Sequence, residues 1–215
     1  MTWIIGVLGF LLIAGLVYWW YTSTGADKGR VVIQSTASGK ETVKSGAILP
    51  RSFNQPEGAV FTYTCWFVVN DYTFNYGMKR TLFNKADCPG VALDSTSNGL
   101  LITIDTYGAK ETILIPNLPA QKWIHLAVSV NQYAVDVFIN GLIRQHHTLT
   151  QLPKQNEETV TVGGDSEWDG TISDLVYYNR SLTAADLDAL VKNVPPNPVT
   201  APAGPPYFGL TWYTG

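Results

Sequence analysis

The chain has 215 residues, with 14 Lys and Arg against 17 Asp and Glu, which gives a formal net charge of −3. Proteins that bind nucleic acid present a basic face to the phosphates, so this balance argues against a nucleic-acid partner. Aromatic residues are plentiful and only 14% of residues are charged, a mixture typical of a β-rich protein with a membrane segment. The length leaves room for one ordinary domain with attachments at its ends.

The first segment, from Trp3 to Tyr21, contains no charged residue. A helix over it would be roughly 28 Å long, close to the ~30 Å hydrocarbon core of a bilayer. Aromatic side chains that favour the membrane–water interface stand at its two ends: Trp3, Tyr18, Trp19, Trp20 and Tyr21. We therefore predict a single transmembrane anchor within residues 1–24, with the lipid bilayer as a partner.

The orientation of this anchor follows from its flanks. A cleaved signal peptide fits less well, because no Lys or Arg precedes the run and the run exceeds the usual apolar region of such peptides. Lys28 and Arg30 follow the run, so the positive-inside rule predicts a domain that faces the cytoplasm. The sequon Asn179–Ser181 would matter only in a lumenal domain, and a strand-end turn is its alternative reading.

From Arg30 to Leu149 the apolar residues follow a period of two, and turn residues separate the runs. The expected strands are 31–33, 60–69, 81–83, 100–105, 112–115, 123–130, 133–139, 142–144, 159–162 and 171–178. Roughly ten strands with one late helix predict an all-β fold, a two-sheet antiparallel jelly-roll sandwich over residues 25–193.

Two local signals support this reading. Asn140–Gly141 stands between two β runs, and a two-residue type I′ hairpin needs positive φ at both of its central positions. The helix is expected over 183–192, where Thr183 can cap the first turn and Asp186 follows three residues later.

Two cysteines, Cys65 and Cys88, leave the compartment open. Secreted domains that depend on disulfides are usually much richer in cysteine, which favours two free thiols over one bridge. The bridge stays an alternative.

Three segments resemble the laminin G-like domains of the concanavalin A-like type. They are Phe61–Trp66, the hairpin that runs from Trp123 to Gly141, and the ending from Gly170 to Leu182. The resemblance covers about residues 55–193 and implies the jelly-roll fold. The signature residues that carry it are Trp66, Trp123, His125, Asn140, Gly141, Gly170 and Asp174.

A narrower resemblance concerns the segments 49–58, 70–77 and 153–156. They are similar to lectin-like proteins encoded by large DNA viruses of algae and protists. Those proteins commonly pair a short N-terminal anchor with this domain, and some relatives sit in virions. The resemblance implies a minor capsid component whose partners are capsid proteins.

The sequence offers little that would support catalysis. Glycosidases of this superfamily need two carboxylates across the scissile bond, and the nearest match, Glu167–Gly170, lacks the third carboxylate of the family strand. His125 is expected to be a satisfied structural imidazole. His146 and His147 are adjacent on a strand and point to opposite faces, which argues against one shared metal. We predict no enzymatic activity.

Calcium is the only cofactor that the sequence raises, and only weakly. Many laminin G-like domains hold calcium at the rim of the sandwich through oxygen ligands. The candidates are Asp94 with Asn98 in one turn, and Asp165 with Glu167 and Asp169 in another. Acidic turn residues are usually solvated turn formers, so no metal site is predicted.

Candidate contacts for a ligand or a partner are aromatic residues in loops and in the tail. The tail, residues 194–215, is rich in proline and is expected to be extended, with an aromatic end that docks on another surface, and a disordered end is the alternative. The candidates are Tyr72, Phe74, Tyr76, Trp168, Tyr207, Phe208, Trp212 and Tyr213. The rings can serve a sugar, a protein partner or internal packing.

Two functions of different classes follow. The first is a structural tether, in which the helix holds a membrane while the domain and tail contact a protein shell. The second is a carbohydrate-binding module displayed on a membrane. Both are non-enzymatic, and the resemblance to viral proteins favours the tether.

Overall fold

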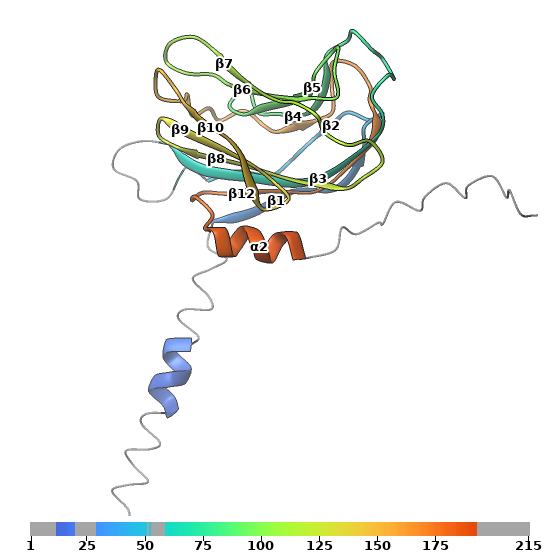
Figure 1. Ribbon diagram of the computed structural model, residues 1–215. Helices are drawn as coiled ribbons and strands as arrows, with labels where there is room; N and C mark the ends of the chain where they lie inside the picture. The colour runs from blue at the N-terminus through green and yellow to red at the C-terminus, as the bar shows by residue number, and fades with distance from the viewer. Residues whose placement is uncertain (1–11, 20–28, 51, 53–58, 193–215) are drawn as a thin grey trace, which may run out of the picture.

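The computed structural model describes residues 12–19, 29–50, 52 and 59–192. Its body is a sandwich of two antiparallel six-stranded sheets, with one helix on the outside of one sheet (Figure 1). The predicted all-β sandwich with one short C-terminal helix is confirmed. The tail 194–215, with Tyr207, Phe208, Trp212 and Tyr213, lies outside the described residues.

The first sheet has the order β1-β12-β3-β8-β9-β10. Its strands are β1 (Arg30–Ser38), β12 (Asp169–Tyr178), β3 (Val60–Asp71), β8 (Ile124–Asn131), β9 (Ala134–Ile139) and β10 (Leu142–Thr148). The second sheet has the order β2-β11-β4-β5-β6-β7. Its strands are β2 (Val43–Lys44), β11 (Thr161–Val162), β4 (Arg80–Asn84), β5 (Gly90–Leu93), β6 (Leu100–Ile104) and β7 (Glu111–Ile115).

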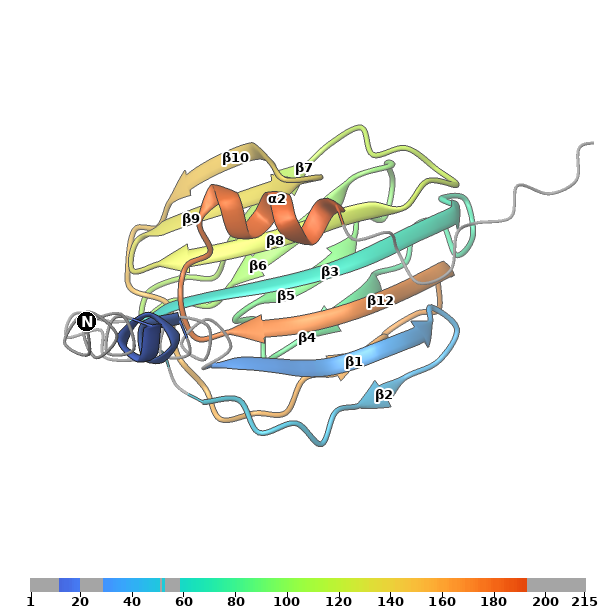
Figure 2. The same ribbon diagram turned by 90° about the horizontal axis from the view of Figure 1, so that it is seen from below.

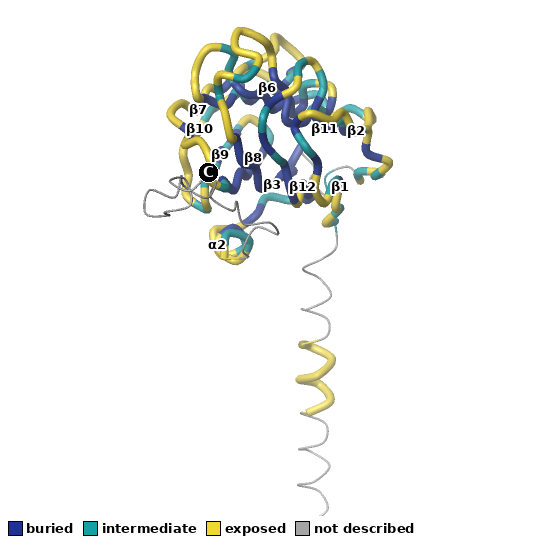
Figure 3. The backbone as a smooth tube through the Cα atoms, turned by 90° about the vertical axis from the view of Figure 1, so that its right-hand side faces the viewer, coloured by how far each residue is buried: buried dark blue, intermediate teal, exposed yellow. Residues whose placement is uncertain are grey.

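The main core lies between the sheets, where alternate residues of each strand meet (Figure 3). In β3, Cys65 and Phe67 point into this core. Residues of the opposite parity in the first sheet point outward, and some of those in β8 and β12 are buried too, because α2 (Ala184–Lys192) packs against this part of the sheet (Figure 2). A smaller cluster there joins Ala127 of β8 and Val176 of β12 to Leu187 of the helix. The helix therefore covers part of the outer face of the first sheet, whereas β10 at its edge stays largely exposed.

Both local signals are confirmed. Asn140 and Gly141 have φ of 52° and 79°, as a type I′ turn requires. At the start of α2, the Asp186 N–H donates to Thr183 Oγ1 at 3.2 Å while the Thr183 N–H donates back to the Asp186 carboxylate at 2.9 Å. This reciprocal pair satisfies two of the helix's exposed amide groups.

Four strands differ most from the prediction, and one of them is β10, which extends to Thr148 rather than ending at residue 144. β1 is nine residues long rather than three, because polar residues continue it as an edge strand beyond an irregularity between Val32 and Gln34. β2 and β5 were not predicted. They have two and four residues, too few to establish a period of two.

The predicted anchor, Trp3–Tyr21, is described only over residues 12–19, so Trp3, Trp20 and Tyr21 lie outside the described part. These eight residues are helical and exposed, as Leu12 and Trp19 illustrate. In the described part of the chain, no helix combines the length and the apolar character needed to cross a membrane.

The structure answers two questions that the sequence left open. Cys65 and Cys88 are both free and buried, and burial raises the pKa of the Cys88 thiol to about 12. Asn179 of the sequon is buried beside Gly29, where an added Cβ would lie 1.8 Å from the Asn179 Oδ1. The sequon therefore begins with a buried asparagine directly after β12, packed against the start of the domain.

Candidate functional site

A groove of about 490 Å³ lies on the outer face of the second sheet, on the opposite side of the sandwich from α2. It extends over β2, β11 and β4. Among the side chains that line it are those of Lys44, Thr81, Asn84, Glu158, Thr161 and Asp165.

The alternation of the strands produces this polar lining. Leu82 and Val162 point into the core, so their neighbours Thr81 and Thr161 must point outward. Because β11 lies directly beside β4, both residues line the same groove, with Thr161 paired to Asn84. Sequence analysis did not identify these residues. The alternation of polar and apolar residues indicates which side chains face outward, but it does not show which strands are neighbours in the sheet.

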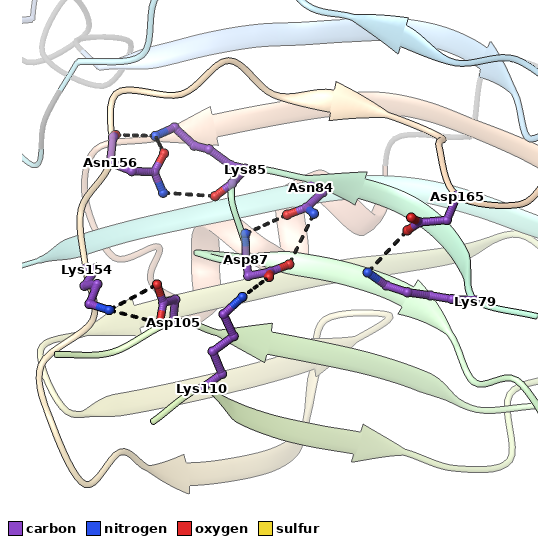
Figure 4. A network of polar contacts seen from close by, with 9 residues as sticks. All are labelled: Lys79, Asn84, Lys85, Asp87, Asp105, Lys110, Lys154, Asn156 and Asp165. Atoms are coloured by element: carbon purple, nitrogen blue, oxygen red, sulfur yellow. Dashed lines mark hydrogen bonds and ion pairs between the residues drawn. The ribbon is translucent and has the colours of Figure 1, made fainter. Parts of the chain in front are cut away.

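One end of the groove is fixed by Asp165, whose carboxylate accepts a hydrogen bond from Thr81 Oγ1 at 2.7 Å. Lys79 Nζ lies 3.2 Å from the same carboxylate (Figure 4). The hydrogen bond and the lysine charge lower the pKa of Asp165, so the group is ionised at neutral pH.

A second network borders the groove at the turn between β4 and β5. The Asp87 N–H donates to Asn84 Oδ1 at 2.7 Å, and Asn84 Nδ2 donates back to the Asp87 carboxylate at 3.2 Å. Lys110 Nζ forms an ion pair with Asp87 at 2.6 Å and lowers the pKa of that carboxyl (Figure 4). Asn84 is thereby held in one orientation.

The segment beyond β10 is tied to the same turn by Lys85. This buried ammonium donates to the Asn156 carbonyl oxygen at 2.5 Å and to Asn156 Oδ1 at 2.8 Å, while Asn156 Nδ2 donates to the Lys85 carbonyl oxygen at 3.0 Å. Lys154 lies 3.4 Å from Asp105 (Figure 4). These contacts fix the chain that leads to Glu158 and Thr159 at the groove wall.

Four of the predicted aromatic contacts are described, and they lie in the β3–β4 loop (Tyr72, Phe74 and Tyr76) and the β11–β12 loop (Trp168). Asn75 Nδ2 donates to the Glu167 carbonyl oxygen at 3.0 Å and joins the two loops. Tyr76 is 60% exposed. Phe74 is half-buried beneath Lys40, whose Nζ lies 5.3 Å from the ring centroid. Tyr72 is half-buried, and burial raises its pKa to about 12.

The prediction for Trp168 is wrong. Its side chain is only 1% exposed and belongs to the core, so it offers no surface to a ligand. Two glycines make room for the indole: a Cβ on Gly39 would lie 2.5 Å from its Cδ2, and one on Gly170 would lie 2.4 Å from its Cζ3. The glycines near this tryptophan admit the ring into the sandwich.

Carboxylates in the two turns considered for calcium are bound to other groups of the protein. Asp94 accepts a hydrogen bond from Ser97, Asp165 is paired with Lys79, and Asp169 lies 3.4 Å from Lys40 Nζ. Lysine ammonium groups beside two of these carboxylates do not fit the all-oxygen donor set that calcium prefers. Among the described residues, no group of three His, Cys, Asp or Glu side chains is arranged to hold a metal ion.

His146 and His147 bind different carboxylates, as their opposite orientations predicted. His146 Nδ1 lies 2.5 Å from Asp136 on the neighbouring strand, and His147 Nε2 lies 2.7 Å from Glu111 of the second sheet. The second contact joins the edges of the two sheets.

The family signature residues occupy structural positions. Trp66 and His125 pair across β3 and β8, and their rings meet edge-on with centroids 5.1 Å apart. The His125 N–H donates to Asn140 Oδ1 at 2.9 Å. His125 is only 2% exposed, as expected of a structural residue, but its Nδ1 finds no hydrogen-bond partner in the described part of the chain. Asp174 has a φ of 49° at an irregularity of β12.

With this geometry established, comparison with known proteins identifies the family. A laminin G family model, described as the concanavalin A-like lectin/glucanases superfamily, matches residues 41–188. The chain belongs to this superfamily. No curated protein matches this lectin/glucanase-superfamily chain in sequence.

Solved structures similar to this superfamily member include clostridial toxin binding domains. A structure of botulinum neurotoxin type C, whose cell entry depends on two ganglioside molecules, has 14% identity and a TM-score of 0.57, with 79% of this chain and 52% of that chain covered. The binding domain of botulinum neurotoxin DC in complex with rat synaptotagmin II has 14% identity and a TM-score of 0.56, with coverage of 76% and 46%.

A third similar structure is the binding domain of Paraclostridial Mosquitocidal Protein 1, with 18% identity, a TM-score of 0.55 and coverage of 76% and 45%. The chain thus spans about half the length of these proteins. At such identities the likeness establishes the fold alone.

Proposed function

We propose that the protein is a non-enzymatic, lectin-like binding module that holds a carbohydrate in the groove of the second sheet. The observation that carries this proposal is the groove itself. Its volume of about 490 Å³ lies within the roughly 300–1,000 Å³ typical of small-molecule sites.

The lining suits a polyhydroxylated ligand. Thr161 supplies a hydroxyl that donates and accepts hydrogen bonds, whereas the Thr81 hydroxyl, which donates to Asp165, can only accept. Asn84 supplies an amide, and Lys44 supplies an ammonium at the exposed edge. Asn84 and Asp165 are already oriented by Asp87 and Thr81. A ligand would therefore meet groups that lose little conformational freedom on binding.

Two of the similar solved structures support a recognition role, since cell entry of botulinum neurotoxin type C depends on two ganglioside molecules and the binding domain of botulinum neurotoxin DC forms a complex with rat synaptotagmin II. Membrane anchoring through residues 1–24 is part of the proposal. The exposed apolar helix at residues 12–19 supports it, because apolar side chains exposed around a helix favour a lipid environment.

A second candidate function is the tether between a membrane and a protein shell, with the domain facing the cytoplasm or the virion interior and capsid proteins as partners. The edge strand β10 favours it. Leu142 is 75% exposed, and the adjacent Ile143 is exposed as well. Exposed apolar residues on an edge strand are suited to contact with another protein.

The first test is glycan binding by the full-length protein in nanodiscs, on an array of neutral and sialylated oligosaccharides. Thr161→Arg places a long charged side chain in the groove. Thr112→Arg is the matched control, because Thr112 is an exposed position of β7 in the same sheet, outside the groove lining. We expect wild type and Thr112→Arg to retain the same oligosaccharides and Thr161→Arg to lose them.

An array on which the wild type retains nothing would refute carbohydrate binding. Protease protection in sealed membranes then separates the two candidates, because a domain that faces the cytoplasm or lies inside a particle has little glycan to meet.

A further inference from the structure

Arg80 opens β4 and is completely buried, with 0% of its surface exposed. Its guanidinium donates to the carbonyl oxygens of Tyr72 at 2.5 Å and Phe74 at 3.0 Å, and also to that of Asp94. Each acceptor is a main-chain carbonyl, and the three come from two different loops. Arg80 Nε finds no acceptor among the described residues. A buried cation therefore holds the loops together through converging oxygens, the role that a bound metal ion plays elsewhere.

Further hydrogen bonds join three loops into one unit, which we name the rim platform: residues 72–79, 94–99 and 163–168. The Gly77 N–H donates to the Ser95 carbonyl oxygen at 2.8 Å, and the Ser166 N–H donates to the Lys79 carbonyl oxygen at 3.1 Å. Asp165, which pairs with Lys79 inside the platform, also lines the groove, so the two regions adjoin.

Of the predicted aromatic contacts that lie in this platform, Tyr76 is the most exposed. Its hydroxyl donates to the Thr96 carbonyl oxygen at 3.1 Å, so both ends of the side chain are anchored while 60% of its surface faces solvent. The ring is fixed before any ligand arrives. The platform also exposes polar residues: Asn75 next to the tyrosine in the chain, Thr96, whose carbonyl oxygen holds the tyrosine hydroxyl, and Glu167, which Asn75 joins.

We propose that the rim platform is a second carbohydrate contact, independent of metal ions, in which Tyr76 stacks on the apolar face of a sugar ring and Arg80 is the positioning residue. This inference rests on the proposed function for the ligand class. A pyranose presents C–H groups on one face and hydroxyls at its edge. The amphipathic tyrosine ring with flanking polar groups matches that pattern. A pre-fixed ring reduces the entropy lost on binding.

The experiment uses the full-length protein in nanodiscs and the best-bound oligosaccharide of the array, titrated by calorimetry with and without excess EDTA. Tyr76→Ala is expected to weaken binding about tenfold. Tyr76→Phe keeps the ring and loses only the bond to Thr96, so we expect a smaller loss. Thr112→Arg is the matched control, with unchanged affinity. EDTA is expected to change no affinity.

Arg80→Met tests the positioning role, and Arg80→Lys tests rescue by a retained charge. We expect Arg80→Met to speed amide hydrogen exchange in residues 72–79 and to weaken binding, and Arg80→Lys to restore part of both. Should Arg80→Met not fold, Tyr76→Ala decides, because an exposed side chain does not hold the fold.

The outcomes separate this inference from the proposed function. Unchanged affinity in Tyr76→Ala, with binding lost in Thr161→Arg, overturns the rim contact and leaves the groove in place. Binding that EDTA abolishes overturns its independence from metal ions. A wild-type protein that binds no oligosaccharide overturns both proposals.

Discussion

His125 makes the stability of the domain depend on pH in a defined direction. The side chain is 2% exposed, and desolvation lowers its pKa from 6.5 to about 4 in the folded protein. Between these two values the unfolded chain binds a proton at this residue and the folded chain does not. The part of the stability that depends on neutral His125 is therefore fully present above about pH 6.5 and is lost as the pH falls toward 4.

The size of this loss follows from the shift. Each pKa unit corresponds to about 1.4 kcal/mol, so His125 removes about 3 kcal/mol of the free energy of unfolding between pH 7 and pH 4. A His125→Gln variant cannot take up this proton. It should be somewhat less stable than the wild type at pH 7, because the edge contact with Trp66 is lost, but it should lose about 3 kcal/mol less on acidification.

Urea denaturation followed by tryptophan fluorescence, at pH 7 and pH 4, measures both quantities. The other titrating groups are common to the two proteins and cancel in the difference. Equal losses on acidification in wild type and His125→Gln would refute the argument, because His125 would then titrate alike in the folded and unfolded chains.

Three further predictions concern packing and capping. Gly170→Ala should be destabilising by about 3 kcal/mol or more in urea denaturation, because its Cβ would lie 2.0 Å from a main-chain oxygen, whereas Gly46→Ala, with nothing within 4 Å, should be near neutral. Cys65 and Cys88 should be unreactive toward a thiol reagent in the native state and react only on unfolding, and rapid native reaction would contradict their burial. Thr183→Ala should cost about 1 kcal/mol and fray α2 in hydrogen exchange, and unaltered exchange would count against the cap.

Much of the fold could be predicted because its signals are local. The Asn140–Gly141 turn and the Thr183 cap each depend on a few neighbouring residues, and both appear in the structure as expected. β2 and β5 were missed for the same reason, since two and four residues carry no periodic signal. β5 is a strand because it pairs with β4 on one side and β6 on the other, which the local sequence does not show.

The candidate site was less predictable because it depends on strand order. Thr81 and Thr161 are far apart in the sequence and line the same groove only because β11 inserts beside β4. Trp168 was wrongly predicted to be a contact because a tryptophan in a loop can either face a ligand or pack inside the domain, and the local sequence does not show which. The decisive neighbour, Gly39, lies on a distant part of the chain, and its missing side chain is what lets the ring enter the core.

The helix explains why a ligand would use the second sheet. α2 covers part of the outer face of the first sheet through Leu187, which is almost fully buried, and the outer face of the second sheet has no such helix in the described part of the chain. The two faces should therefore be separable by mutation. Leu187→Ala should lower the free energy of unfolding by about 2–3 kcal/mol and increase hydrogen exchange in α2.

The same variant should leave glycan affinity unchanged while the domain stays folded, because the groove lies across the full thickness of the sandwich from the helix. Asp188→Ala, an exposed position on α2, is the control and should alter stability by only a few tenths of a kcal/mol. Loss of glycan affinity in Leu187→Ala at a temperature where it remains folded would mean that the helix shapes the ligand site, and the groove would then not be an independent face of the domain.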